Sequence, residues 1–229
     1  MLKSAPPNAD QLLSGKKRNL ANVIYYSCVV LLSSYLERYV ESLTVEAIDA
    51  INNENPLLKT IPELLRVVQV KEMLSDLSMV LQKDMTKDNV SRMIRKSQSL
   101  LKDYGWFLDD LQPFGKLKGE PLIGDNRFSN PSPEKIDALF RHLGIRSVVG
   151  RVIGLETKSD RVAVRDKVKE MIDKRNNIAH TGGTVTVTGQ DVAAYLLYSR
   201  RLVRGIDTLI GHEVKKLPVE HGLGYDIYQ

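Results

Sequence analysis

The residues best suited to chemistry lie in the stretch DKRNNIAHTGG, at positions 173–183, where His180 follows Arg175 by five positions. A histidine titrates near neutral pH, so it can take a proton from a ribose hydroxyl or deliver one to a leaving oxygen. An arginine can hold a phosphate through two parallel hydrogen bonds and stabilise charge in a transition state. The pair therefore fits RNA cleavage that needs no metal ion and no cofactor.

The surroundings of the pair matter more than its spacing, because a chain with 4 His produces such an Arg and His pair by chance in roughly a quarter of cases. Arg175 continues an apolar helical stripe, and a buried guanidinium needs a partner or an interface. Asn176 lies one turn before His180, so its amide can orient the imidazole or bind a ligand. The stripe consists of Val164, Val168, Met171 and Ile172.

Arg175 and His180 do not share a face of an ideal helix, because five residues turn the helix through about 140°. Three explanations remain open. In the first, Arg175 pairs with a core carboxylate such as Glu37, and His180 is an exposed residue at a helix end. In the second, the helix is distorted near Gly182 and Gly183. In the third, a second copy of the chain closes the site and supplies the acid or base that a single histidine cannot provide.

The net charge of +5 lies entirely in the segment that leads into the motif. Residues 141–175 hold ten Lys and Arg against five Asp and Glu, whereas the rest of the chain is balanced. RNA would be attracted to this segment, although a solvated helix face explains such a run as well. The candidate RNA contacts are Arg161, Arg165, Lys169 and Lys174.

No metal or membrane site is expected. His212 and Glu213 are adjacent, which is not the spacing of zinc ligands. The uncharged stretch from Leu20 to Leu36 has the minimum length for a membrane span, but its Asn, Ser and Tyr residues favour a buried core helix. The single Cys28 and the absence of an apolar leader in MLKSAPPNAD lead us to expect a cytoplasmic protein.

The hydrophobic periodicity predicts an all-α bundle of about six to eight helices in a single domain, residues 1–229, with tails at 1–9 and 217–229. Val23 to Leu43 is apolar on nearly every side, so we expect it to form the middle of the bundle. The expected helices span about 10–53, 61–83, 86–101 with Thr86 as N-cap, 133–143, 158–181 and 191–216.

A long irregular loop is expected near residues 113–132, where Gly, Pro, Asn and Asp accumulate. Ser132 should cap the next helix, with Pro133 at its first position and Gly144 as its stop. Its core face consists of Ile136, Leu139, Phe140 and Leu143. Asp191 should open the last helix, whose core candidates are Val192, Tyr195, Leu196, Leu202, Val203, Ile206 and Leu209.

Three stretches resemble the HEPN superfamily. KRNNIAHTGG matches the HEPN signature of an arginine, a polar residue and a following histidine. LLSSYLERYVESL, residues 31–43, resembles the early core helix of RiboL-PSP-type and related HEPN proteins. RFSNPSPEKIDALFRHLGI, residues 127–145, resembles the segment that precedes their motif.

The resemblance implies a helical homodimer with metal-independent endoribonuclease activity and the motif helices facing each other across the interface. Arg175 and His180 would be the catalytic pair, Asn176 the supporting polar residue, and Glu37 either Arg175's partner or an orienting group. It also implies a toxin or antiphage effector that an antitoxin or regulatory protein restrains. The alternative is a non-catalytic helical module that binds RNA or a partner protein, because some HEPN domains only bind.

Overall fold

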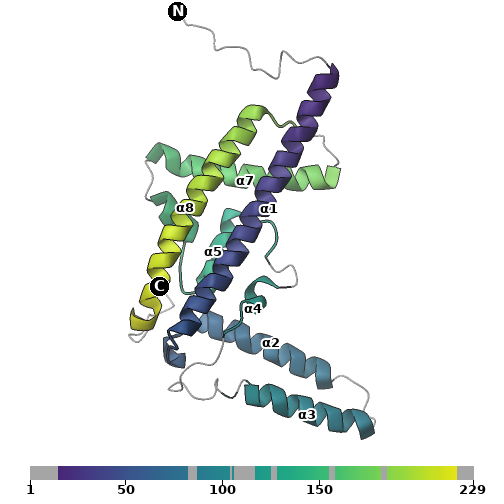
Figure 1. Cartoon of the computed structure of the whole chain (residues 1–229), viewed down its shortest axis with the longest axis vertical. Helices are drawn as coiled ribbons and strands as arrows, with labels where there is room; N and C mark the ends of the chain where they lie inside the picture. The colour runs from purple at the N-terminus through teal and green to yellow at the C-terminus, as the bar shows by residue number, and fades with distance from the viewer. Residues whose placement is uncertain are drawn as a thin grey trace, which may run out of the picture. The chain divides into compact units, whose positions relative to one another are not determined.

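The computed structural model describes residues 15–81, 87–103, 105, 117–124, 128–154, 158–181 and 185–220 (Figure 1). These residues form helices and no strands, which confirms the all-α prediction. The elements are α1 (Gly15–Asn53), the short 3-10 helix η2 (Leu58–Thr60), α2 (Glu63–Leu81), α3 (Lys87–Asp103), α4 (Glu120–Ile123), α5 (Pro133–His142), α6 (Val148–Gly154), α7 (Lys158–Thr181) and α8 (Gly189–Glu220).

The chain divides into two compact units. Unit 1 comprises Met1–Val40, Ser129–Ile136 and Val149–Ile206, and unit 2 comprises Glu41–Phe128, Asp137–Val148 and Asp207–Gln229. The helices α1, α5, α6 and α8 contribute residues to both units. The expected tail at residues 1–9 lies outside the described residues, and residues 217–220 continue α8.

Unit 1 is built on α7, which lies across α1 and α8 (Figure 1). The predicted α7 stripe of Val164, Val168, Met171 and Ile172 is buried, and so are Tyr195, Leu202 and Ile206 of α8. Leu196 is 45% exposed, so its expected place in the core is wrong. The approach of α6 to α8 is very close, because a Cβ on Gly205 would collide with Val152.

The first helix differs from the expectation that Val23 to Leu43 forms the middle of the bundle. Its buried residues include Val29, Leu36 and Val40, whereas another part of its surface exposes Leu20, Val23, Ile24, Leu31 and Tyr35. Apolar residues occur on several faces of α1, so the sequence does not reveal which of them is covered.

By length and composition alone, Asn19–Asn53 could cross a membrane, and 17% of its most apolar window is buried. Hydrogen bonds nevertheless join α1 to other segments of unit 1. The Tyr26 hydroxyl donates to the Val185 carbonyl at 2.6 Å, and the Tyr39 hydroxyl donates to the Val203 carbonyl at 3.1 Å. These bonds place α1 in the packing of unit 1.

Unit 2 contains α2 and α3 as an antiparallel pair (Figure 1). Two side-chain amides hold the segment before α4. Asn52 exchanges hydrogen bonds with the backbone N–H and carbonyl of Leu117, and Gln69 does the same with Lys118. The short helix α4 follows, so the expected irregular loop at 113–132 contains a helical turn that its Gly and Pro content concealed.

The helix ends follow local signals to within a few residues. The backbone N–H of Ile136 donates to the Ser132 carbonyl, and Gly144 has φ 78°, so the predicted start and stop of α5 are confirmed. All four residues predicted for the core face are buried: Ile136, Leu139 and Phe140 in α5, and Leu143 in the turn that follows it. Thr86, the expected cap of α3, lies outside the described residues, and α6 was not expected.

Candidate active site

The helix α7 carries Arg175, Asn176 and His180 on its last two turns. It is continuous from Lys158 to Thr181, so its regular geometry includes His180. Arg175 and His180 are therefore separated by about 140° around the axis and about 7.5 Å along it. The helix is not distorted at any position up to Thr181, so a distorted helix end does not explain the pair within this range. Residues 182–184 lie outside the described residues.

Arg175 is half-buried, and its guanidinium is held by two amide oxygens. Its Nη1 donates to Oδ1 of Asn130 at 2.7 Å and to Oδ1 of Asn176 at 3.1 Å. Asn176 was a candidate site residue from the sequence. Asn130, which precedes α5 by three positions, was not predicted to contact Arg175.

Glu37 reaches this cluster through Asn130 instead of pairing with Arg175. Its Oε2 accepts a hydrogen bond from the Asn130 backbone N–H at 3.2 Å. Among the described residues no ion pair joins Glu37 to Arg175, so of the two roles considered for Glu37 the direct pair is not observed, and a chain of hydrogen bonds runs through Asn130 instead.

Asn130 occupies a left-handed backbone conformation, with φ 55°. Asparagine tolerates this region better than most residues, because its short polar side chain bonds locally. The Asn130 carbonyl also accepts from the backbone N–H of Ser132 at 2.7 Å. These bonds fix both ends of the residue whose side chain contacts Arg175.

The donors of Arg175 are not all used. A guanidinium carries five N–H bonds, and Nη1 supplies two of them. Both described hydrogen bonds of Arg175 use Nη1. The edge formed by Nε and Nη2 therefore has no partner among the described residues, and this edge has the geometry that binds two phosphate oxygens at once.

His180 is exposed in the last turn of α7. No hydrogen bond joins its ring to another described residue. Asn176, one turn earlier, accepts a hydrogen bond from Arg175 with its amide oxygen, and no hydrogen bond between described residues uses its N–H₂ group. The histidine can therefore approach a ligand from solvent.

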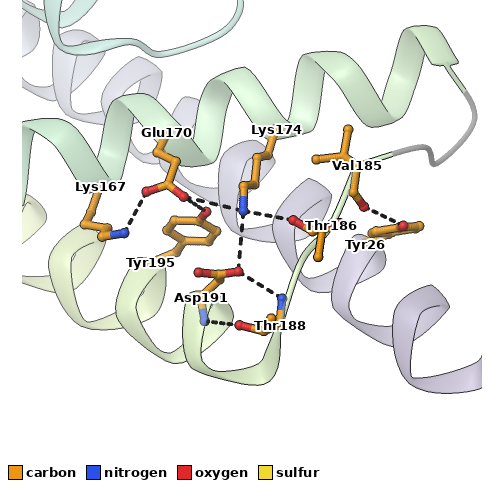
Figure 2. Close-up of polar contacts among 9 residues, drawn as sticks. All are labelled: Tyr26, Lys167, Glu170, Lys174, Val185, Thr186, Thr188, Asp191 and Tyr195. Atoms are coloured by element: carbon orange, nitrogen blue, oxygen red, sulfur yellow. Dashed lines mark hydrogen bonds and ion pairs between the residues drawn. The ribbon is translucent and has the colours of Figure 1, made fainter. Parts of the chain in front are cut away.

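A cluster of charged and polar residues anchors the chain that follows His180 (Figure 2). The ammonium of Lys174 donates to the Thr186 carbonyl at 2.9 Å and lies 3.4 Å from carboxylate oxygens of both Glu170 and Asp191. The Tyr195 hydroxyl donates to Glu170 at 2.9 Å. This cluster joins α7 to the first turns of α8.

The start of α8 has a reciprocal cap. The Thr188 N–H donates to Oδ2 of Asp191 at 3.0 Å, and the Asp191 N–H donates to the Thr188 hydroxyl at 3.2 Å. Thr188 is therefore the N-cap, and Asp191 lies at the third helical position. The sequence had instead predicted that Asp191 opens the helix. The helix begins two residues earlier than predicted.

The titration of the cluster follows from its hydrogen bonds. Burial raises the pKa of Glu170, but hydrogen bonds from Lys167 and Tyr195 outweigh burial, so this pKa lies below its ordinary value. Burial likewise raises the pKa of Asp191, whereas hydrogen bonds from Thr188 and the charge of Lys174 bring it below its ordinary value. Burial and the neighbouring Glu170 both raise the pKa of Tyr195. At neutral pH the two carboxylates are charged.

The four candidate RNA contacts have different environments. Lys169 is exposed, and Arg165 makes a 2.8 Å ion pair with Glu134. The ammonium of Lys174 is engaged inside the anchoring cluster. The side chain of Arg161 lies outside the described residues. In the described part of the chain no three His, Cys, Asp or Glu side chains gather as metal ligands would.

The described helices place a half-buried arginine and an exposed histidine on the last two turns of one helix, α7. The family model of RiboL-PSP-HEPN matches residues 8–212, so the chain belongs to this family of the HEPN superfamily. HEPN domains are often ribonucleases, and membership supports a ribonuclease or a nucleotide-binding helical module. No curated protein and no solved structure matches the chain significantly.

Proposed function

We propose that this protein is a metal-independent endoribonuclease whose active site forms between two copies of the chain. The observation that carries the proposal is the state of Arg175. Two amide oxygens hold its Nη1, and its Nε and Nη2 edge has no partner among the described residues. A helix of a HEPN family member thus presents a fixed cation and an exposed histidine five residues apart.

The proposed chemistry is attack of a ribose 2′-hydroxyl on the adjacent phosphate. His180 takes the hydroxyl proton, and a second His180 gives a proton to the departing 5′-oxygen. The Arg175 edge binds two phosphate oxygens and stabilises the charge that develops on them. The products are a 2′,3′-cyclic phosphate and a 5′-hydroxyl end, and every atom and proton is accounted for without a metal ion.

The geometry of α7 supports the proposal of a second copy. One copy holds one motif histidine, and it diverges from Arg175 around a continuous helix. A twofold axis near the motif would bring two Arg175 and two His180 side chains to one phosphate. The exposed apolar residues of α1 in the same unit also fit a surface that a partner covers.

The RNA path is proposed to follow the basic face of α7. Lys169 is exposed and Arg165 is held by only a surface ion pair, so both can turn toward a phosphate at little cost. Lys174 instead serves the structure, since its ammonium already has three partners. The expected contribution of these residues is affinity and not sequence choice.

The test is cleavage of RNA by the purified protein in EDTA. We expect wild type to leave cyclic phosphate and 5′-hydroxyl ends, and Arg175→Ala and His180→Ala to be folded and inactive. The matched controls are Arg92→Ala and His212→Ala, which remove an exposed arginine and an exposed histidine outside the basic segment 141–175 and the motif. Equal cleavage by wild type and both motif variants would overturn the proposal.

The same variants separate catalysis from binding. RNA binding that survives both substitutions, with no cleavage of any RNA by wild type, would identify a non-catalytic module. We further propose a toxin or antiphage role under the control of a partner protein. Expression should then arrest growth, and His180→Ala should relieve the arrest.

A further inference from the structure

We propose that Asn130 is a positioning residue that determines which edge of Arg175 faces the RNA phosphate. This inference rests on the proposed function. Asn130 lies 45 positions before Arg175 in the chain, yet its side-chain oxygen makes the shorter of the two hydrogen bonds to Nη1, at 2.7 Å. The partner on the neighbouring residue, Asn176, lies at 3.1 Å.

The position of the Asn130 side chain is itself fixed from two sides. The backbone N–H of Asn130 donates to the Glu37 carboxylate, and the backbone carbonyl of Asn130 accepts a hydrogen bond from the Ser132 N–H. The φ angle of 55° lies in a region that asparagine and glycine enter more easily than other residues. Glu37 therefore acts on Arg175 through Asn130, by holding the backbone that carries the amide.

The acceptor on Asn130 is neutral, and this has a consequence for phosphate binding. A carboxylate at the same place would pair with the guanidinium and cancel the charge that attracts a phosphate. An amide oxygen holds Nη1 without cancelling that charge. The arrangement directs the Nε and Nη2 edge away from the protein acceptors while Arg175 keeps its full attraction for an anion.

Two substitutions distinguish the effect of the Asn130 side-chain oxygen from the effect of the Asn130 backbone conformation. Asn130→Gly keeps the left-handed conformation and the N–H that Glu37 accepts, but it removes the side-chain oxygen. Asn130→Asp keeps the shape and the oxygen but adds a negative charge. Asn55→Gly is the matched control, because Asn55 is another asparagine with positive φ, at 46°, in unit 2.

The expected results are specific to positioning. Asn130→Gly should lower kcat/KM for RNA by about tenfold or more, as expected for loss of a hydrogen bond to a charged group. Asn130→Asp should weaken binding of a non-cleavable 2′-deoxy oligonucleotide by about tenfold at 0.1 M salt, while its melting temperature is not lowered. Asn55→Gly should change neither quantity. A purely structural role for Asn130 predicts that Asn130→Gly lowers the melting temperature and leaves kcat/KM of the folded protein unchanged.

A second readout keeps this inference separate from the proposed reaction. The second readout is nitrogen NMR of the arginine guanidinium groups, in which the Arg175 signal is identified because it disappears in Arg175→Lys. Rotation about the Cζ–Nη1 bond of Arg175 should be slow in wild type and faster in Asn130→Gly. Absence of cleavage by wild type would refute the proposed function, and the NMR comparison would still decide the role of Asn130. Identical Arg175 signals in wild type and Asn130→Gly, or unchanged kcat/KM in an active enzyme, would overturn the inference.

Discussion

Replacement of Lys174 by Met should destabilise the protein through the segment that follows the motif. The ammonium of Lys174 donates to the Thr186 carbonyl and lies 3.4 Å from carboxylate oxygens of Glu170 and Asp191 (Figure 2). The Lys174 side chain is 20% exposed, and those of Glu170 and Asp191 are 35% and 25% exposed. Solvent therefore screens the ion pairs in part.

The magnitude follows from these three contacts. A hydrogen bond from a charged donor and two screened ion pairs together stabilise the fold by about 2 kcal/mol. For a chain of this size such a loss lowers Tm by roughly 4–8 °C. Lys169→Met is the matched control, because Lys169 lies five positions earlier on the same helix and is exposed. Its Tm should change by less than about 2 °C.

The effect should depend on pH with a defined sign. The pKa values of Glu170 and Asp191 lie below their ordinary values of 4.5 and 3.8 in the folded state. The stability that these carboxylates contribute is complete above the ordinary values and is lost as pH falls through the lowered values. Thermal unfolding followed by circular dichroism should show the full gap between wild type and Lys174→Met at pH 7 and a smaller gap at pH 3. Equal Tm values at pH 7, or a gap of the same size at pH 3, would refute this reasoning.

Two further predictions concern packing and RNA binding. Gly205→Ala should destabilise the protein by about 1–3 kcal/mol, because the added Cβ would collide with Val152, and Gly211→Ala, which meets nothing within 4 Å, is the control for denaturant unfolding. An unchanged midpoint for Gly205→Ala would contradict the close approach of α6 and α8. Lys169→Ala should reduce the slope of log K against log salt for single-stranded RNA by about 0.7, measured by fluorescence anisotropy, as expected for one lost phosphate contact. A slope equal to that of wild type would remove Lys169 from the RNA path.

Local signals in the sequence were sufficient for the parts of the fold that depend on neighbouring residues. Ser132 and Pro133 predicted the start of α5, and Gly144 predicted its end. The apolar spacing predicted the buried stripe of α7 that brings Arg175 to a half-buried position. These features are encoded within a few turns of one helix, so one sequence is enough to read them.

Features that depend on contacts between distant segments were not predicted. Asn130 contacts Arg175 across 45 positions, and no periodicity connects a loop asparagine to a helix arginine. The following Pro131 favours an extended backbone at Asn130, so the left-handed φ of 55° was not evident from the sequence either. The exposed residues of α1 were misjudged for a similar reason, because apolar composition does not say which face is covered. The prediction that Leu196 of α8 is buried was wrong for the same reason.

The most direct test of the central claim, that one active site requires His180 from two copies, is cleavage by mixed dimers. Wild type and His180→Ala are unfolded together in equal amounts, refolded and assayed on RNA in EDTA. If each site needs two histidines, only wild-type pairs are active, and random pairing leaves about a quarter of the activity of the same total amount of wild type. A residual activity of about a half would show that each copy acts alone and would contradict the shared site.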